Sequence, residues 1–153
     1  MNAFPTTGQR ATTLVVLTLL LTACGGASGR LTHAELVRRA NAICVDQTRK
    51  IVRIPRGPST ALNAAGYLGA VLSVAEQGLK QFHALRPPKA DEPLYGSFLR
   101  ELDRNTNDLR TLRAAAAARD RKDYVIGVAD LHGSRVRINN LERRLGLNRC
   151  ASG

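Results

Sequence analysis

The sequence predicts an all-α domain, an antiparallel, up-down-up-down four-helix bundle, and composition and periodicity are the two observations that predict it. Apolar residues make up 44% of the 153-residue chain and charged residues 23%, a balance typical of globular proteins. Aromatic residues reach only 4% and Trp is absent, so Leu, Ala, Val and Ile must build the core. Such a core suits packed helices better than a β-sandwich. Four amphipathic segments follow one another, separated by proline-rich or charged breaks.

The first two segments have recognisable ends. Thr32 and Glu35 have the spacing of a capping box, which predicts a helix start at Thr32. Pro55 and Pro58 end this helix because proline cannot continue it. Ser59 or Thr60 is the predicted cap of the second helix, and the prolines at 87–88 stop it. The predicted stripes of the two helices are Leu36, Val37, Ala40, Ile43, Cys44, Gln47 and Ile51, and Tyr67, Leu68, Val71, Leu72, Ala75, Leu79 and Phe82.

The third helix is predicted to start at 91–93, where acids and a proline occupy the first turn. Its stripe runs from Leu94 to Ala116 and is interrupted by Asn105 and Thr106. The charged run 119–123 indicates a break before the fourth helix, although one longer helix through this run is the alternative. Gly146 followed by Leu147 matches a Schellman-type end of the fourth helix.

The N-terminal region has the three parts of a secretory signal. One cation, Arg10, precedes an apolar run over 11–21, and small residues follow. The run is about half of the ~20 residues that a membrane-spanning helix needs. Leu21-Thr22-Ala23-Cys24 resembles the bacterial lipobox, which implies a diacylglyceryl group on Cys24 and cleavage after Ala23.

These features predict a lipoprotein signal peptide over 1–23, a flexible Gly/Ser tether over 24–31 and a helical domain over 32–153. The expected location is the extracytoplasmic face of a cell membrane, with acyl chains such as palmitate as the anchor. The alternatives are an ordinary secretory peptide and an uncleaved anchor that happens to end in cysteine.

Lipid on Cys24 leaves two cysteines, Cys44 and Cys150. An exported domain folds in an oxidising compartment, so an even remainder of two predicts a disulfide between them. Two buried free thiols are the alternative. A redox-enzyme role is weaker because the chain has no Cys-x-x-Cys motif.

Three further elements resemble a group of small uncharacterised actinobacterial lipoproteins. They are the ANAIC element at 40–44, the LRPP element at 85–88 and the closing LGLNRC element at 145–150. The resemblance covers most of the chain and implies the helical fold and the disulfide. It implies no activity.

No catalytic or cofactor motif is present in the sequence, so no enzyme activity, cofactor or metal is expected. His33, His83 and His132 lie on three different predicted helices, without the spacing of a metal site. The acid pairs 91–92 and 120/123 lie at predicted helix starts, where capping explains them.

Charge is the remaining clue, because 23 basic residues face 12 acidic ones for a formal charge of +11. A solvated polar face is one interpretation, and contact with an anionic surface is the other. The export signal makes nucleic acid an unsuitable partner. The candidate contact residues are Arg38, Arg39, Arg135, Arg137, Arg143 and Arg144.

We therefore expect a non-enzymatic, membrane-anchored helical module that binds anionic lipid, a cell-wall polymer or another envelope protein. The alternative is a carrier of a small ligand or metal that uses the interior of the bundle.

Overall fold

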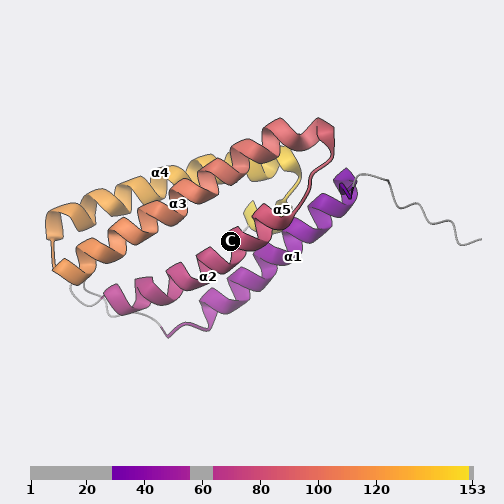
Figure 1. Ribbon diagram of the computed structural model, residues 1–153. Coiled ribbons are helices and arrows are strands. Elements are labelled where there is room, and N and C mark those ends of the chain that lie inside the picture. Colours follow the sequence, from indigo (N-terminus) through magenta and orange to yellow (C-terminus); the bar gives the residue numbers. More distant parts are fainter. Residues whose placement is uncertain (1–28, 56–63, 152–153) are drawn as a thin grey trace, which may run out of the picture.

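The computed structural model describes residues 29–55 and 64–151 (Figure 1). The predicted signal peptide, Cys24 and most of the predicted tether lie outside the described residues, as do Ser59 and Thr60. Arg30 and Leu31, at the end of the predicted tether, contact the domain. The backbone N–H of Leu31 donates to the carbonyl of Arg86 (2.8 Å), and Arg30 pairs with Glu92.

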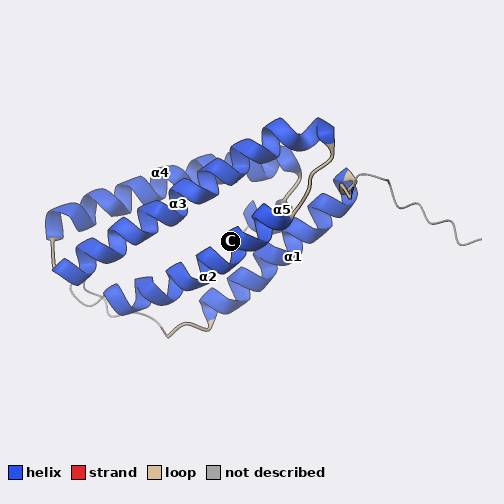
Figure 2. Ribbon diagram, viewed as in Figure 1, coloured by secondary structure: helices blue, strands red, loops and turns tan. Residues whose placement is uncertain are grey.

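The described chain contains helices and loops and no strand (Figure 2), which confirms the prediction of an all-α domain. Its helices are α1 (His33–Val52), α2 (Ala65–Ala84), the 3-10 turn η2 (Lys89–Asp91), α3 (Glu92–Ala118), α4 (Arg121–Leu145) and the short α5 (Asn148–Ala151).

Most helix ends form where local chemistry predicts them. Thr32 caps α1, and the capping box with Glu35 is complete in both directions. The bonds that Glu35 accepts from the backbone and side chain of Thr32 hold the pKa of Glu35 below its ordinary value. Gly146 ends α4 with φ +76°, and the N–H of Leu147 donates to the carbonyl of Glu142 (2.8 Å), the long-range bond of a Schellman motif.

Three features differ from the sequence-based expectation or resolve it. Helix α2 begins at Ala65, and its N-cap Ala64 makes no side-chain capping bond. The predicted caps, Ser59 and Thr60, lie outside the described residues. Helices α3 and α4 are separate, because Arg119 takes a left-handed conformation (φ +58°) and Asp120 caps α4. Helix α5 was not expected, since a single turn carries too little periodicity to be recognised.

The helices pack in chain order: α2 contacts both α1 and α3, and α3 packs along α4. Within the described chain, α1 and α4 do not pack extensively on each other, and α5 contacts both of them (Figure 1). The largest buried side chains cluster near one end, where Phe82 and Phe98 meet edge to face with ring centroids 5.3 Å apart. The buried Tyr95 hydroxyl donates to the carbonyl of Phe82 (2.8 Å), so its polar atom is satisfied.

A disulfide joins Cys44 of α1 to Cys150 of α5, with their Cα atoms 5.1 Å apart. The two cysteines paired by the cysteine count therefore lie at disulfide distance in the structure. The bond closes a loop between residues 106 apart in sequence. It ties the first long helix to the segment that follows the last one.

Replacing both cysteines with alanine should lower the free energy of unfolding substantially, because the cross-link restricts the unfolded chain. For a loop of about 100 residues the chain-entropy model gives about 4.7 kcal/mol. Urea unfolding followed by circular dichroism measures the change. Reductant added to the wild type should reproduce the loss, while the double variant should be insensitive to it. Equal stability of the two proteins would contradict a structural role for the bond.

Candidate functional site

A cavity of about 470 Å³ lies among the four long helices, next to the disulfide. Its size falls within the range of about 300–1,000 Å³ typical of small-molecule sites. The wall is mostly apolar and takes side chains from every long helix. Representative lining residues are Ile51 of α1, Leu79 of α2, Leu102 of α3 and Leu131 of α4.

The cavity follows from the way α1 and α4 are joined. A closed four-helix arrangement would pack these two helices directly and fill the space between them. Here α5 contacts both, and its Cys150 reaches Cys44. Both cysteines line the cavity, so the disulfide forms part of its wall.

Three polar side chains in the lining already donate to the protein. The Nε2 of Gln47 donates to the carbonyl of Val74 (3.3 Å), and its side chain fills the space beside the buried Gly78. The Nδ2 of Asn105 donates to Ser134 Oγ (2.8 Å). The hydroxyl of Thr106 donates to its own helix (2.9 Å). These interactions fix the three polar groups at the cavity wall.

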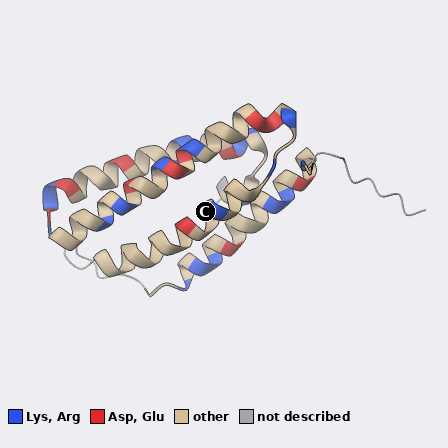
Figure 3. Cartoon of the chain, viewed as in Figure 1, with Lys and Arg blue, Asp and Glu red and all other residues tan. Residues whose placement is uncertain are grey.

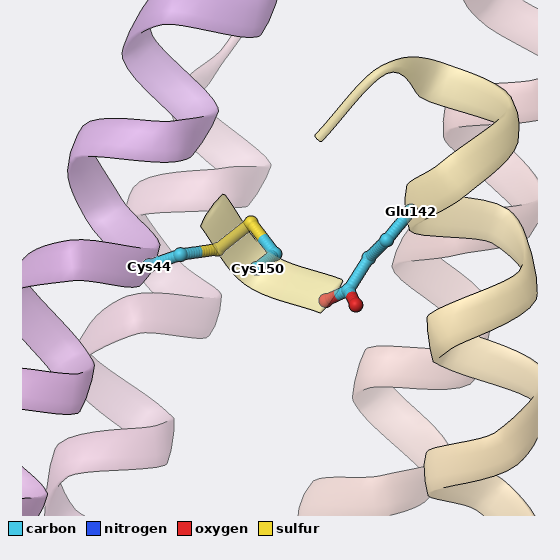
Figure 4. A group of neighbouring side chains, drawn as sticks. All are labelled: Cys44, Glu142 and Cys150. Atoms are coloured by element: carbon cyan, nitrogen blue, oxygen red, sulfur yellow. A yellow bond between two sulfur atoms is a disulfide. The ribbon is translucent and has the colours of Figure 1, made fainter. Parts of the chain in front are cut away.

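Glu142 is the exceptional residue of the lining, because it carries an acidic group and is only 3% exposed. It reaches from α4 toward the disulfide (Figure 4), and a carboxylate oxygen and both sulfurs lie within 4.8 Å of one another. Its Oε2 makes no hydrogen bond to the described residues. Burial raises the pKa of Glu142 above its ordinary value, against the guanidinium groups of Arg135 and Arg143, which lower it. A buried acceptor with no partner is costly and therefore points to a function.

The group Cys44, Glu142 and Cys150 has ligand types that metals use, but the two sulfurs are bonded to each other. Metals bind thiolates, so the disulfide form offers only the Glu142 carboxylate from this group. The arrangement is not a ready-made metal site.

The predicted arginines occupy different environments. Arg38 and Arg39 are exposed on α1. On α4, Arg137 pairs with Glu101 (2.8 Å) and Arg143 bonds Asn140. Arg135 lines the cavity.

The segments of α1 and α4 that carry four of these arginines nevertheless lie close together at one end of the molecule. Gly146, at the end of α4, lies against Val37 in the second turn of α1. Arg38 and Arg39 follow Val37, and Arg143 and Arg144 precede Gly146. Figure 3 shows Lys and Arg positions interspersed with Asp and Glu positions along the helices.

The histidines do not converge. His33 pairs with Asp91 (2.7 Å) and His83 with Asp103 (3.1 Å), and all three histidines are exposed. Both pairs link neighbouring helices at the surface. Within the described chain, the cysteine–glutamate group is the one cluster of three potential metal ligands.

Helix α4 also exposes large apolar side chains. Val125, Val128 and Val136 are 62%, 46% and 47% exposed. Their spacing of three and eight residues places them on one side of the helix. This stripe is a second surface feature that sequence periodicity did not identify.

Sequence reasoning missed Glu142 as a site residue, although a signal was present. Glu142 lies four residues after Ile138 and three before Leu145, so it falls on the apolar stripe of α4. An acid at that position predicts either a buried partner or a site. Asn105 and Thr106, noted as interruptions of the α3 stripe, are also in the cavity wall.

No protein-family model, curated protein or solved structure matches the chain. None of the described helices combines the length and apolarity that crossing a membrane would require.

The raised pKa of Glu142 makes stability depend on pH. Because the folded state holds this proton more tightly than the unfolded state, the free energy of unfolding falls as pH rises above about 4.5, the ordinary value. Glu142→Gln removes this dependence, so the free energy of unfolding of the variant should rise relative to that of the wild type as pH increases above about 4.5.

Urea unfolding of both proteins across this pH range measures the difference. Glu76→Gln, which changes an exposed carboxyl on α2, is the matched control. Its free energy of unfolding should still fall with rising pH as Glu142 loses its proton. Parallel pH profiles for Glu142→Gln and the wild type would contradict the effect of burial.

Proposed function

We propose that the chain is a membrane-anchored extracytoplasmic lipoprotein whose helical domain is a non-enzymatic binding module of the cell envelope. In this proposal residues 1–23 are removed, Cys24 carries the lipid, and the residues that follow tether the domain. The observation that carries the proposal is the short apolar run ending in Leu21-Thr22-Ala23-Cys24.

The anchor has a simple physical basis. Each buried methylene of an acyl chain contributes about 0.8 kcal/mol, and two chains hold a protein stably where one does not. The resemblance to small actinobacterial lipoproteins agrees with this placement. The disulfide agrees with it too, because such bonds persist in oxidising compartments.

The domain is proposed to be an up-down-up-down bundle. Paired residues support antiparallel neighbours, since the numbers rise in one helix as they fall in the next. Gln47 bonds Val74 while Leu31 bonds Arg86. Across α3 and α4, Glu101 pairs with Arg137 and Asn105 bonds Ser134.

The position of the basic residues supports an anionic surface as partner. The chain enters the domain at Leu31, beside Arg86, and α4 ends against α1 near the same place. A lipid on Cys24 would therefore hold Arg38, Arg39, Arg143 and Arg144 close to the membrane. Cations near an anionic surface contribute about 1 kcal/mol each to binding. The exposed valines on one side of α4, Val125, Val128 and Val136, support another envelope protein as a further partner.

The cavity favours a second candidate, a carrier of a small ligand. A filled core would have counted against this function. The observation that carries it is the space of about 470 Å³ with Glu142 in its wall, whose buried Oε2 makes no hydrogen bond to the described residues. The disulfide makes the metal version of this function less suitable than the small-molecule version.

Cys24→Ala tests the anchor, because the alanine cannot form the thioether. We expect the variant to leave the membrane fraction or to accumulate as an uncut precursor of higher mass. Membrane fractionation and mass spectrometry of the N-terminal peptide measure both outcomes. Ser28→Ala, four residues further on, is the control and should fractionate like the wild type. If Cys24→Ala also behaves like the wild type, the lipoprotein proposal is wrong.

Charge reversal tests the anionic-surface contact. The double variant Arg143→Glu/Arg144→Glu should reduce binding of the unlipidated Cys24→Ser chain to phosphatidylglycerol vesicles about tenfold or more at low ionic strength. Vesicle sedimentation measures the binding.

The matched control reverses Arg121 and Lys122, two exposed cations in the first turn of α4, at the other end of that helix. Equal losses for the two pairs would show that net charge, rather than this end of the molecule, governs the interaction. Circular dichroism verifies that both variants fold.

A further inference from the structure

We infer that the cavity binds a small molecule with an apolar body and one hydrogen-bond-donating head group, an amine or a hydroxyl, which meets Glu142. The inference rests on the second candidate function above and specifies its ligand class. It does not depend on the lipid anchor.

The apolar part of the ligand follows from the wall. Leucine, isoleucine, valine and phenylalanine make up half of the lining residues and come from all four long helices. The disulfide adds a further wall without a strong hydrogen-bonding group. A ligand confined there gains from the removal of apolar surface from water, about 25 cal/mol for each Å².

The head group follows from Glu142. Its Oε2 is buried, makes no hydrogen bond to the described residues and belongs to a side chain in the cavity wall. An ionised carboxylate is purely an acceptor, so only a donor can satisfy it. Gln47 and Asn105, which also line the cavity, donate to Val74 and Ser134, and neither amide bonds Oε2 of Glu142.

A donor is preferred over an anionic head group for an electrostatic reason. A ligand carboxylate would place a second negative charge beside Glu142, away from water, where like charges repel strongly. Arg135 lines the same cavity, but it already has an interaction within the protein. An amine would instead form a charge-assisted hydrogen bond with Glu142, the stronger kind.

Three probes with the same tail separate the head groups: octylamine, 1-octanol and octanoate. Isothermal titration calorimetry on the full 153-residue chain carrying Cys24→Ser measures each affinity without a lipid anchor or detergent. We expect octylamine to bind most tightly, 1-octanol to follow, and octanoate to bind at least about tenfold more weakly than octylamine.

Glu142→Gln tests the head-group contact. It should weaken octylamine binding about tenfold or more and remove the preference for octylamine over octanoate. Retained affinity and preference in this variant would overturn the assignment of Glu142. The tightest binding by octanoate would overturn the donor head group.

Ala75→Leu tests the location, because Ala75 lines the cavity and a larger side chain would occupy its volume. Octylamine binding should be lost. Ala70→Leu, which places the same side chain at an exposed position of α2, should bind like the parent. Equal affinity in all three chains would place the ligand outside the cavity.

Absence of binding by all three probes, in a chain with an intact disulfide and helical circular dichroism, would overturn the inference. Fractionation of Cys24→Ala would still decide the anchor separately. Failure of the ligand class and failure of the lipoprotein proposal are therefore distinguishable.

Discussion

The link between α1 and α5 is the constraint on which the rest of the described structure depends. Helix α1 packs on α2 along one side and contacts α5, to which the bond between Cys44 and Cys150 joins it. The left-handed Gly146 allows the chain to leave α4 and turn toward α1. A single turn of helix and one covalent bond thus replace the direct packing of α1 on α4 that would close a bundle.

Two energetic costs accompany this arrangement, and both converge on the same place. An interior space forfeits the van der Waals contacts that a filled core would make. The buried Oε2 of Glu142 loses its hydration and gains no hydrogen bond from the described residues in return. Either alone is tolerable in a domain with a large aromatic and leucine cluster. Their coincidence at Glu142 is the basis on which we propose that a ligand completes this site.

Sequence reasoning succeeded where local chemistry determines structure. Thr32 with Glu35, Pro93 and Gly146 set helix ends through interactions within a few residues, and the cysteine count gave the disulfide. It failed where distant segments decide the outcome. Nothing near Ala64 signals the start of α2, and the single turn of α5 has no period to detect. The cavity was unforeseeable because it results from a gap between helices that are far apart in sequence.

Cys150 follows all four long helices along the chain, and this has a consequence for assembly. During vectorial emergence from a ribosome or a translocation pore, α1 appears first and must wait for its covalent partner until α4 has emerged. A contact across 106 residues forms late, because closing so long a loop has a high entropic cost. The interior site, whose wall includes that last-arriving cysteine, therefore exists only in the completed domain and in no shorter nascent fragment.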